Sequence, residues 1–219
     1  MSEKTKNNLH GLTLEQLESL CQQHSLPRFA AKQIARWLYV RRVSDIDQMT
    51  DQSKATRQLL KEHYDLGLSS PLKESVSADG TKKYLFPVMC SHRRGLNISC
   101  NGSRDAGELE EGAVEAVMIP DDDRATLCVS SQSGCRMGCK FCMTGRQGFH
   151  GHMSAADLIS QFIAVDESDQ LTNTVFMGMG EPLDNYENVM RVIEILTADW
   201  GFGWSPKRIT LSTIGVLPN

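Results

Sequence analysis

The spacing of hydrophobic residues in the first third of the chain predicts a helical module. Three segments carry apolar side chains three or four positions apart, as helices with one buried face do: residues 13–24, 29–40 and about 52–64. Thr13 and Gln16 are placed to form a capping box at the first helix, and Asp51 or Ser53 is placed to cap the third. We therefore expect a small helical accessory domain over residues 1–70.

Beyond residue 71 the hydrophobic repeat changes to the alternation that is typical of strands. Four short strands are predicted from it, at residues 72–77, 81–86, 114–119 and 125–131. The turn Asp79-Gly80 joins the first two as a hairpin, and residues 120–123 form a turn between the last two. Residues 88–111 are polar without a clear repeat, so we expect an inserted loop in a hairpin and strand segment over 71–120.

In the last part of the chain, strands and helices alternate. Helices are predicted at residues 154–165 and 186–198, and strands at 173–179 and 208–214. Ser154 and Asp157 are placed to cap the first of these helices. Repeated strand–helix units indicate a parallel α/β layer or barrel, so the fold class expected for the chain is α/β.

The charge distribution excludes a strong overall attraction to nucleic acid. The chain has 23 Lys and Arg against 27 Asp and Glu, a formal net charge of −4. An RNA contact would therefore need a local basic patch, although a solvated surface is the simpler explanation for each basic pair. The pairs in question are Arg41-Arg42, Lys82-Lys83 and Arg93-Arg94.

The cysteines and the absence of apolar segments favour the cytoplasm. Residues 1–10 are polar and lack the apolar core of a signal peptide. No apolar run approaches the ~20 residues of a membrane-spanning helix, so no membrane contact is expected. Seven cysteines, three of them within eight residues, indicate metal binding or chemistry in a reducing compartment rather than structural disulfides.

The central motif is a C-x3-C-x2-C loop formed by Cys135, Cys139 and Cys142. Three thiolates on a four-iron cluster leave one iron open to a substrate group, whereas electron-transfer clusters are closed by four cysteines. The nearby glycines allow the loop to curl around an inorganic core. Two alternatives are a zinc ion completed by His150 or His152, and three unrelated buried cysteines.

This cysteine spacing directly after a strand resembles the signature of the radical S-adenosylmethionine (SAM) superfamily. The resemblance implies a [4Fe–4S] cluster whose open iron binds the amino and carboxylate groups of SAM. One electron from the cluster then cleaves SAM to methionine and a 5′-deoxyadenosyl radical. It also implies a (βα)6 barrel, of which residues 121–219 would form only the amino-terminal half.

The surrounding motifs are more specific. They are TLCVSSQSGC (126–135), FCMTGRQGF (141–149), MGMGEPL (177–183) and LSTIG (211–215). In this order they resemble the RlmN/Cfr family of RNA methyltransferases. The RlmN branch, which methylates C2 of adenosine in 23S rRNA and some tRNAs, is favoured over the Cfr branch, which methylates C8. A non-catalytic RNA-binding fragment is the alternative from another functional class.

The resemblance assigns roles to residues on the later strands. Cys135, Cys139 and Cys142 would hold the cluster, while Gly180, Glu181 and Ser212 would contact SAM. A carboxylate at the end of a parallel strand is where barrel enzymes place functional groups. Without the resemblance, Glu181 would read as a turn residue before Pro182, and Ser212 as a packing residue in a strand.

Two upstream residues are assigned catalytic roles by the same resemblance. Cys128 would help to resolve a protein–RNA adduct through a transient disulfide with a second cysteine, although its position alone indicates a buried small residue. Glu115 would be the proton acceptor; its apolar neighbours suggest a buried carboxylate with a raised pKa, and an exposed strand glutamate is the alternative.

The implied partners are 23S rRNA and tRNA, together with an electron donor such as flavodoxin or ferredoxin, and we expect a monomer. The helical module and the Lys82-Lys83 hairpin are the candidate RNA contacts. In the family a cysteine near the carboxyl terminus is first methylated by SAM, but no cysteine follows Cys142 here. We therefore expect this chain to be an incomplete piece that does not methylate RNA alone.

Overall fold

The computed structural model describes residues 6–88 and 112–216. The inserted loop predicted at 88–111, with Cys90 and Cys100, lies outside the described residues except for Val88. The helical module is built around three α-helices, a short π-helix, a 3-10 turn and two paired two-residue strands. Their bounds are β1 Asn7–Asn8, α1 Leu14–Gln23, α2 Arg28–Ala35, η1 Arg36–Val40, η2 Ile46–Gln48, α3 Lys54–His63 and β2 Tyr64–Asp65.

Local capping determines where these helices begin. The predicted box is present at α1, where the backbone N–H of Gln16 donates to the Thr13 hydroxyl and that of Thr13 donates to the Gln16 side chain. Ser53 caps α3, whereas Asp51 accepts a hydrogen bond of 2.6 Å from the Trp37 indole. The predicted second helix continues from α2 into η1, so its last turn is a π-helix.

One six-stranded sheet joins the predicted hairpin to the α/β part of the chain. Its order is β10-β9-β6-β5-β4-β3, in which β6, β9 and β10 are parallel and β3 to β6 are antiparallel neighbours. The strands are β3 Lys73–Val76, β4 Lys82–Pro87, β5 Ala113–Asp121, β6 Arg124–Cys128, β9 Asn173–Phe176 and β10 Ile209–Leu211. The turn predicted at 120–123 is shorter than expected, because β5 pairs with β6 as far as Asp121.

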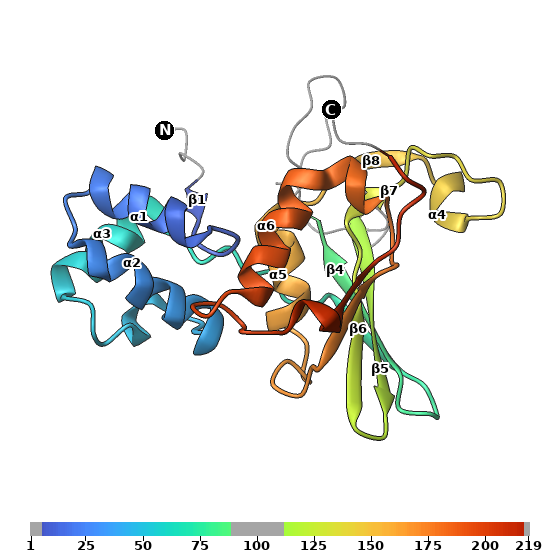
Figure 1. Cartoon of the computed structure of the whole chain (residues 1–219), viewed down its shortest axis with the longest axis horizontal. Coiled ribbons are helices and arrows are strands. Elements are labelled where there is room, and N and C mark those ends of the chain that lie inside the picture. Colours follow the sequence, from blue (N-terminus) through green and yellow to red (C-terminus); the bar gives the residue numbers. More distant parts are fainter. Residues whose placement is uncertain (1–5, 89–111, 217–219) are drawn as a thin grey trace.

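Helices α5 (Ala155–Ile163) and α6 (Tyr186–Thr197) lie between the helical module and the sheet (Figure 1). The predicted cap is present at α5, where Ser154 and Asp157 bond reciprocally. The face of the sheet that packs on these helices carries a row of buried side chains, including Val114, Leu127 and Phe176. Burial of this row supplies the apolar contact that joins the two layers.

The opposite face of the sheet carries a different set of side chains. The register aligns Val117, Cys128 and Val175 across β5, β6 and β9, and all three are half-buried. Ile119 and Thr210, on the same face, are exposed. In the described part of the chain the sheet is open, with β10 and β3 as its edges, and forms part of a barrel rather than a closed one.

The helical module packs directly on α5 and α6. Tyr39 is fully buried, and its ring lies 5.8 Å from that of Trp200. Gly11, at φ +85°, lies against the first turn of α5: an added Cβ would stand only 2.6 Å from the backbone nitrogen of Ala156. The module and the sheet therefore share one continuous hydrophobic core. None of the described helices has the length and apolar character that crossing a membrane requires.

Burial of His10 in the helical module makes stability depend on pH. Its ring nitrogens lie 2.7 Å from the Leu66 carbonyl oxygen and 3.3 Å from that of Leu38, and desolvation lowers its pKa to about 4. An imidazole with a depressed pKa stabilises the fold above pH 6.5 and progressively loses that contribution as the pH falls toward 4.

We expect acidification from pH 7 to pH 5 to lower the free energy of unfolding by about 2 kcal/mol more in the native chain than in His10→Gln. Urea unfolding at the two pH values measures this difference. Equal losses in both proteins would show that the native His10 ring is not held neutral.

Candidate active site

Three loops interlock where the parallel strands β6, β9 and β10 end. The backbone N–H of Ser131 donates to the Met179 carbonyl at 2.8 Å, and the N–H of Met179 donates to the Ser130 hydroxyl at 2.8 Å. Gly178 and Gly180 fit between these loops because neither has a side chain: a Cβ on Gly180 would stand 2.5 Å from that of Gln132. Each of the three strands consequently ends three residues earlier than predicted.

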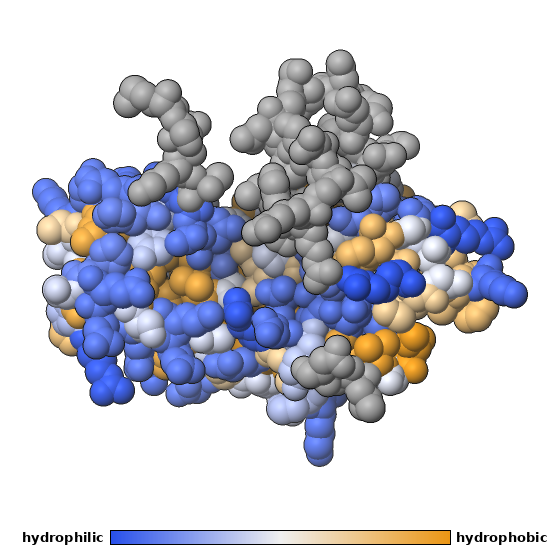
Figure 2. All heavy atoms as spheres, turned by 90° about the horizontal axis from the view of Figure 1, so that it is seen from above, coloured by the Kyte–Doolittle hydropathy of each residue, from blue (hydrophilic) through white to orange (hydrophobic). Residues whose placement is uncertain are grey.

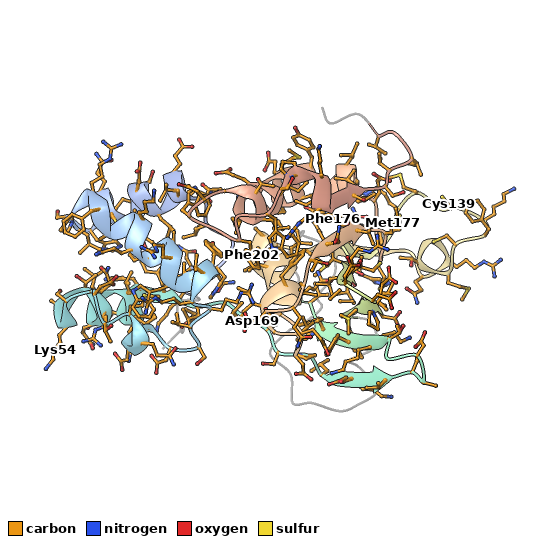
Figure 3. All side chains as sticks on the ribbon, turned by 60° about the horizontal axis from the view of Figure 1, so that its bottom comes forward. Lys54, Cys139, Asp169, Phe176, Met177 and Phe202 are labelled. Atoms are coloured by element: carbon orange, nitrogen blue, oxygen red, sulfur yellow. The ribbon has the colours of Figure 1, made fainter. Side chains whose placement is uncertain are left out.

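The cysteine loop follows β6 directly. It runs through β7 (Gln132–Gly134), the short helix α4 (Met143–Arg146) and β8 (Phe149–His152), and all three motif cysteines are half-buried free thiols. Gly138 turns the loop at φ +61°, where an L side chain would be strained. Cys139 and Met177 lie toward the same end of the molecule, one on the loop and the other just past β9 (Figure 3).

Local hydrogen bonds and charges act differently on the Cys142 and Cys135 thiols. Backbone N–H groups of Gly145 and Thr144 donate to Cys142 and hold the pKa of its thiol below the ordinary value. Burial raises the pKa of the Cys135 thiol, and the negative charge of the other two thiolates adds to this rise. Three ionised thiols on one loop would repel one another, and a bound cation or cluster would offset this repulsion.

The histidines of the zinc alternative are engaged elsewhere. The His150 ring lies 3.0 Å from the Gln147 carbonyl oxygen, and the His152 ring lies 3.1 Å from both the Gln132 amide and the Arg136 guanidinium. Within residues 6–88 and 112–216, no three His, Cys, Asp or Glu side chains are grouped so as to hold a metal ion. Among these residues the structure therefore shows neither the alternative zinc set of three cysteines and one histidine nor three cysteines already gathered to hold a metal ion.

Glu181 connects the ends of two strands. Its side chain is buried and accepts hydrogen bonds from the Thr213 hydroxyl at 2.5 Å, the Ile214 N–H at 3.1 Å and the Leu183 N–H at 3.0 Å. The hydrogen bond from Leu183 caps the short 3-10 helix η3 (Pro182–Asn185). Glu181 is therefore also a turn residue before Pro182, as its sequence position alone suggests. A carboxylate offers about four acceptor positions, which leaves one for a further donor.

The structure brings the other two predicted SAM contacts to the same strand ends. Gly180 precedes Glu181 at φ +99°, and its backbone is stacked against Gln132. Ser212 was expected within a strand, but β10 ends at Leu211 and Ser212 is exposed just beyond it. The reason is that the next two residues, Thr213 and Ile214, turn away to bond Glu181.

Glu115 and Cys128 lie on the open face of the sheet, but Glu115 is not buried. Its side chain is 49% exposed and pairs with the Lys83 ammonium at 2.9 Å, so the expectation of a buried carboxylate is wrong. The apolar neighbours that suggested burial point to the other face of β5. Cys128 is half-buried, and burial raises the pKa of its thiol.

A hollow of about 670 Å³ lies between the cysteine loop and strands β4 and β5. Its lining includes Glu115 and Leu85 from the sheet, Gly134 and Thr144 from the cysteine loop, and Met179 from the loop after β9. This size lies in the range of small-molecule sites. Exposed hydrophobic surface gathers at this end of the molecule, whereas the surface over the helical module is mostly hydrophilic (Figure 2).

A polar network below the cysteine loop was not identified from the sequence. The Gln132 amide accepts from the Glu181 N–H at 2.9 Å and donates to Asp184 at 2.6 Å. Arg136 pairs with Asp184 at 2.9 Å, and its guanidinium lies over the Phe149 ring. Gln132 lies inside one of the recognised motifs, but only the fold shows that it connects Glu181 to the cysteine loop.

Two family models match the chain. Residues 7–66 match the ribosomal RNA large subunit methyltransferase N-terminal domain, and residues 129–219 match the radical SAM superfamily. A relative from Bacteroides fragilis, named "Probable dual-specificity RNA methyltransferase RlmN", is 52% identical over 211 residues. The chain belongs to the RlmN family of radical SAM proteins. The predicted recognition is thereby confirmed.

The similarity to the Bacteroides relative spans 96% of this chain and 56% of the relative. A dual-specificity RNA methyltransferase RlmN from Bdellovibrio bacteriovorus is 40% identical, with 96% of this chain and 49% of the relative covered. A radical SAM methyltransferase from Sphaerobacter thermophilus, known as a crystal structure, is 34% identical with a TM-score of 0.79. That likeness covers 96% of this chain and 57% of the other, so the chain spans about half the length of its relatives.

The cofactors of this family are a [4Fe–4S] cluster and SAM, and the donor groups of the chain suit both. Three half-buried thiols on one glycine-turned loop match a cluster that leaves one iron without a protein ligand. The hollow beside the loop and the remaining acceptor position of Glu181 suit a small polar ligand.

We expect Glu181→Ala to lower the free energy of unfolding by about 2 kcal/mol, because Thr213, Ile214 and Leu183 each lose a hydrogen-bond acceptor. Urea unfolding measures the change, and hydrogen exchange at Ile214 should accelerate. Glu187→Ala, which removes an exposed carboxylate from α6, is the matched control and should change stability by less than about 0.5 kcal/mol. Similar losses in both variants would contradict the bridging role.

Proposed function

We propose that the chain forms the cluster and SAM site of a radical SAM RNA methyltransferase that acts on C2 of adenosine in 23S rRNA and tRNA. The observation that carries the proposal is the convergence at the ends of β6, β9 and β10, where the cysteine loop, the Gly180-Glu181 turn and Ser212 meet. The names of the relatives support the substrate class, since they describe dual-specificity RNA methyltransferases.

In this proposal Cys135, Cys139 and Cys142 hold the [4Fe–4S] cluster, and Gly180, Glu181 and Ser212 contact SAM. The bound cluster and SAM supply a 5′-deoxyadenosyl radical, which adenine C2 requires because that carbon is not nucleophilic. Glu181 receives the amino group of SAM at its fourth acceptor position, while its three present donors fix the carboxylate. Because Gly180 has no side chain, its backbone can lie directly against Gln132.

Cys128 and Glu115 take the roles on the substrate side. The register places Cys128 opposite Val117, two residues from Glu115 on the same face, so both side chains reach the space in front of the sheet. Lys83 orients the Glu115 carboxylate beside the hollow, where it can accept a proton from the substrate carbon. Cys128 would act through its thiolate: it would attack the sulfur of a second cysteine in the protein–RNA adduct, so that a transient disulfide forms while the sulfur–carbon bond to the adenine substituent breaks and Glu115 removes the C2 proton. This reaction requires proton loss from a thiol that is half-buried here.

The partners follow from this chemistry. We propose that RNA is the substrate, that a flavodoxin or ferredoxin supplies the electron, and that the protein acts as a monomer in the cytoplasm. We also propose that the chain has three parts: a helical accessory domain over residues 1–70, a hairpin and strand segment over 71–120, and the amino-terminal half of a radical SAM barrel over 121–219. Lys82 is unsuited to RNA binding, because it is paired with Glu167 at 2.6 Å and with Glu74 and Asp166 at longer distances.

We expect anaerobic reconstitution with iron and sulfide to load one [4Fe–4S] cluster per chain, with iron and sulfide contents to match. Cys139→Ala should lose the cluster absorbance, because one of three ligands is gone. Cys21→Ala, at a buried cysteine of the helical module, is the control that should retain it. Bound zinc in place of iron, or a Cys139→Ala protein with an intact cluster, would overturn the assignment.

A further inference from the structure

The helical module contains a segment that is rich in cations and free of carboxylates. Between Glu18 and Asp45 the sequence has no acidic residue. The same segment carries five cations, Arg28, Lys32, Arg36, Arg41 and Arg42, in a chain whose net charge is −4. Such local separation of charge produces a positive surface on an otherwise acidic protein.

Helical geometry places most of these cations on one side of α2 and η1. Arg28, Lys32 and Arg36 are exposed and follow one another at four-residue intervals, which corresponds to steps of about 6 Å. Arg41 is also exposed, and its guanidinium lies 4.3 Å from the centre of the Trp37 ring. The buried side of α2, which includes Ile34, packs into the core, so the cations are not needed for folding.

An aromatic side chain accompanies the cations. Phe29 is 66% exposed on α2, so its ring is accessible to a ligand. It lines a hollow of about 670 Å³ together with Leu14, Gln33 and the cations Arg28, Lys32 and Arg36, and Glu18 is the one carboxylate in that lining. We call the exposed side chains of Arg28, Phe29, Lys32, Arg36 and Arg41 the α2 face.

The ion pairs already present on the α2 face are weak competitors for another anion. Arg28 lies 3.7 Å from Glu18, and Lys32 lies 3.6 Å from Asp199. In each pair the basic side chain is more than half exposed, and pairs of this kind contribute little and are screened by salt. An anion with several charges can therefore displace them.

We propose that the α2 face is an RNA-binding surface, in which the cations hold phosphates and Phe29 stacks on an unpaired base. This combination of a basic track with an exposed aromatic is how proteins bind single-stranded or looped RNA. The inference rests on the proposed function, and the match of residues 7–66 to an rRNA methyltransferase domain favours RNA over an acidic protein.

The position of the α2 face adds a requirement on the RNA. The helical module and the cysteine loop lie at opposite ends of the longest axis of the molecule (Figure 1), and Lys54 and Cys139 mark these ends in Figure 3. An RNA that contacts both must therefore be extended along the protein. A folded RNA can do so, whereas a strand of a few nucleotides bound at the cysteine loop cannot.

The test is RNA binding by the whole chain as a function of KCl concentration, with a folded 23S rRNA fragment and a strand of about ten nucleotides as probes. We expect R28A/K32A/R36A to bind the folded RNA roughly 100-fold more weakly at physiological salt and to reduce the log–log salt slope by about two to three. K54A/K73A/K207A makes the same change in net charge at exposed lysines elsewhere and should bind nearly as the native chain.

Phe29 is tested separately from charge. Phe29→Ala should weaken binding of the folded RNA roughly tenfold with the salt slope unchanged, and Phe29→Trp should retain affinity. Equal losses for the two triple variants, or a Phe29→Ala chain that binds like the native one, would overturn the proposal, as would an α2 face that captures acidic proteins but no RNA. Cluster loading of the same variants separates this failure from failure of the proposed cofactor site.

Arg42 belongs to the same basic segment but turns into the protein. Its side chain is 19% exposed, and one terminal nitrogen donates to the Ser168 hydroxyl at 2.8 Å and to the Asp169 carboxylate at 2.6 Å. Its guanidinium lies 4.9 Å from the centre of the Phe202 ring. These partners follow α5 and α6, so one residue connects the helical module to both helices that cover the sheet.

Arg42 makes these contacts in a costly conformation. Its backbone lies at φ +50°, a region that non-glycine residues rarely occupy. The Nε atom is buried and has no hydrogen-bond partner among the described residues. A strained backbone and an unsatisfied buried donor at the same residue are seldom kept for stability alone.

The geometry points to Arg42 as a positioning residue that fixes the orientation of the α2 face relative to the active site. Arg42→Ala should then weaken binding of the folded RNA about five- to tenfold without changing the salt slope, because no phosphate contact is lost. Binding of the short strand should not change. Hydrogen exchange should accelerate around Ser168 while the helices remain protected.

Arg42→Lys is a second variant that keeps the charge, but its shorter side chain has no planar guanidinium to lie over the Phe202 ring, and it should resemble Arg42→Ala. Arg41→Ala, at the exposed neighbour, should instead reduce the salt slope by about one. If Arg42→Ala lowers only the unfolding temperature, or changes the salt slope as Arg41→Ala does, the positioning role is wrong.

Discussion

The arrangement of the proposed active site depends on the buried carboxylate of Glu181. Three donors converge on it, two of them from the segment that follows β10, while its own backbone N–H is held by Gln132 at the start of the cysteine loop. Residues from three consecutive parallel strands are thereby tied at one point. Because buried acceptors must be satisfied, this arrangement constrains all three loops together. The cysteine loop is positioned relative to the loops after β9 and β10 through these bonds.

The two faces of the sheet have different roles in the structure. One face packs on α5 and α6, the helical module packs on these helices in turn, and all three share one hydrophobic core. The other face presents Glu115 and Cys128 beside the hollow that reaches the cysteine loop. The two residues proposed to react thus lie on the face that the described helices leave accessible, as expected for the inner surface of a barrel enzyme.

Much of this fold could be predicted from local sequence. Helical repeats, the capping boxes at Thr13 and Ser154, and the Asp79-Gly80 hairpin depend on neighbouring residues, so the sequence alone predicts them. The spacing of the three cysteines likewise depends on one loop. Their motif indicates the cofactor chemistry without any knowledge of tertiary contacts.

What the sequence did not predict involves partners far along the chain. Arg42 and Lys82 were expected at a solvated surface, yet they are paired with Asp169 and Glu167. Glu115 was expected to be buried because its sequence neighbours are apolar, but alternation along β5 turns it to the open face. Asp184 and Arg136 meet only after the loops of β6 and β9 interlock. Each of these outcomes depends on tertiary contacts that no local pattern encodes.

The most direct test of a joint cluster and SAM site is electron paramagnetic resonance of the reconstituted, reduced chain with and without SAM. We expect a reduced [4Fe–4S] signal whose g values shift when SAM binds to the open iron, and a smaller shift in Glu181→Gln. A signal that SAM leaves unchanged in the native chain would contradict the open-iron site, and an equal shift in Glu181→Gln would contradict the role of Glu181 in binding SAM.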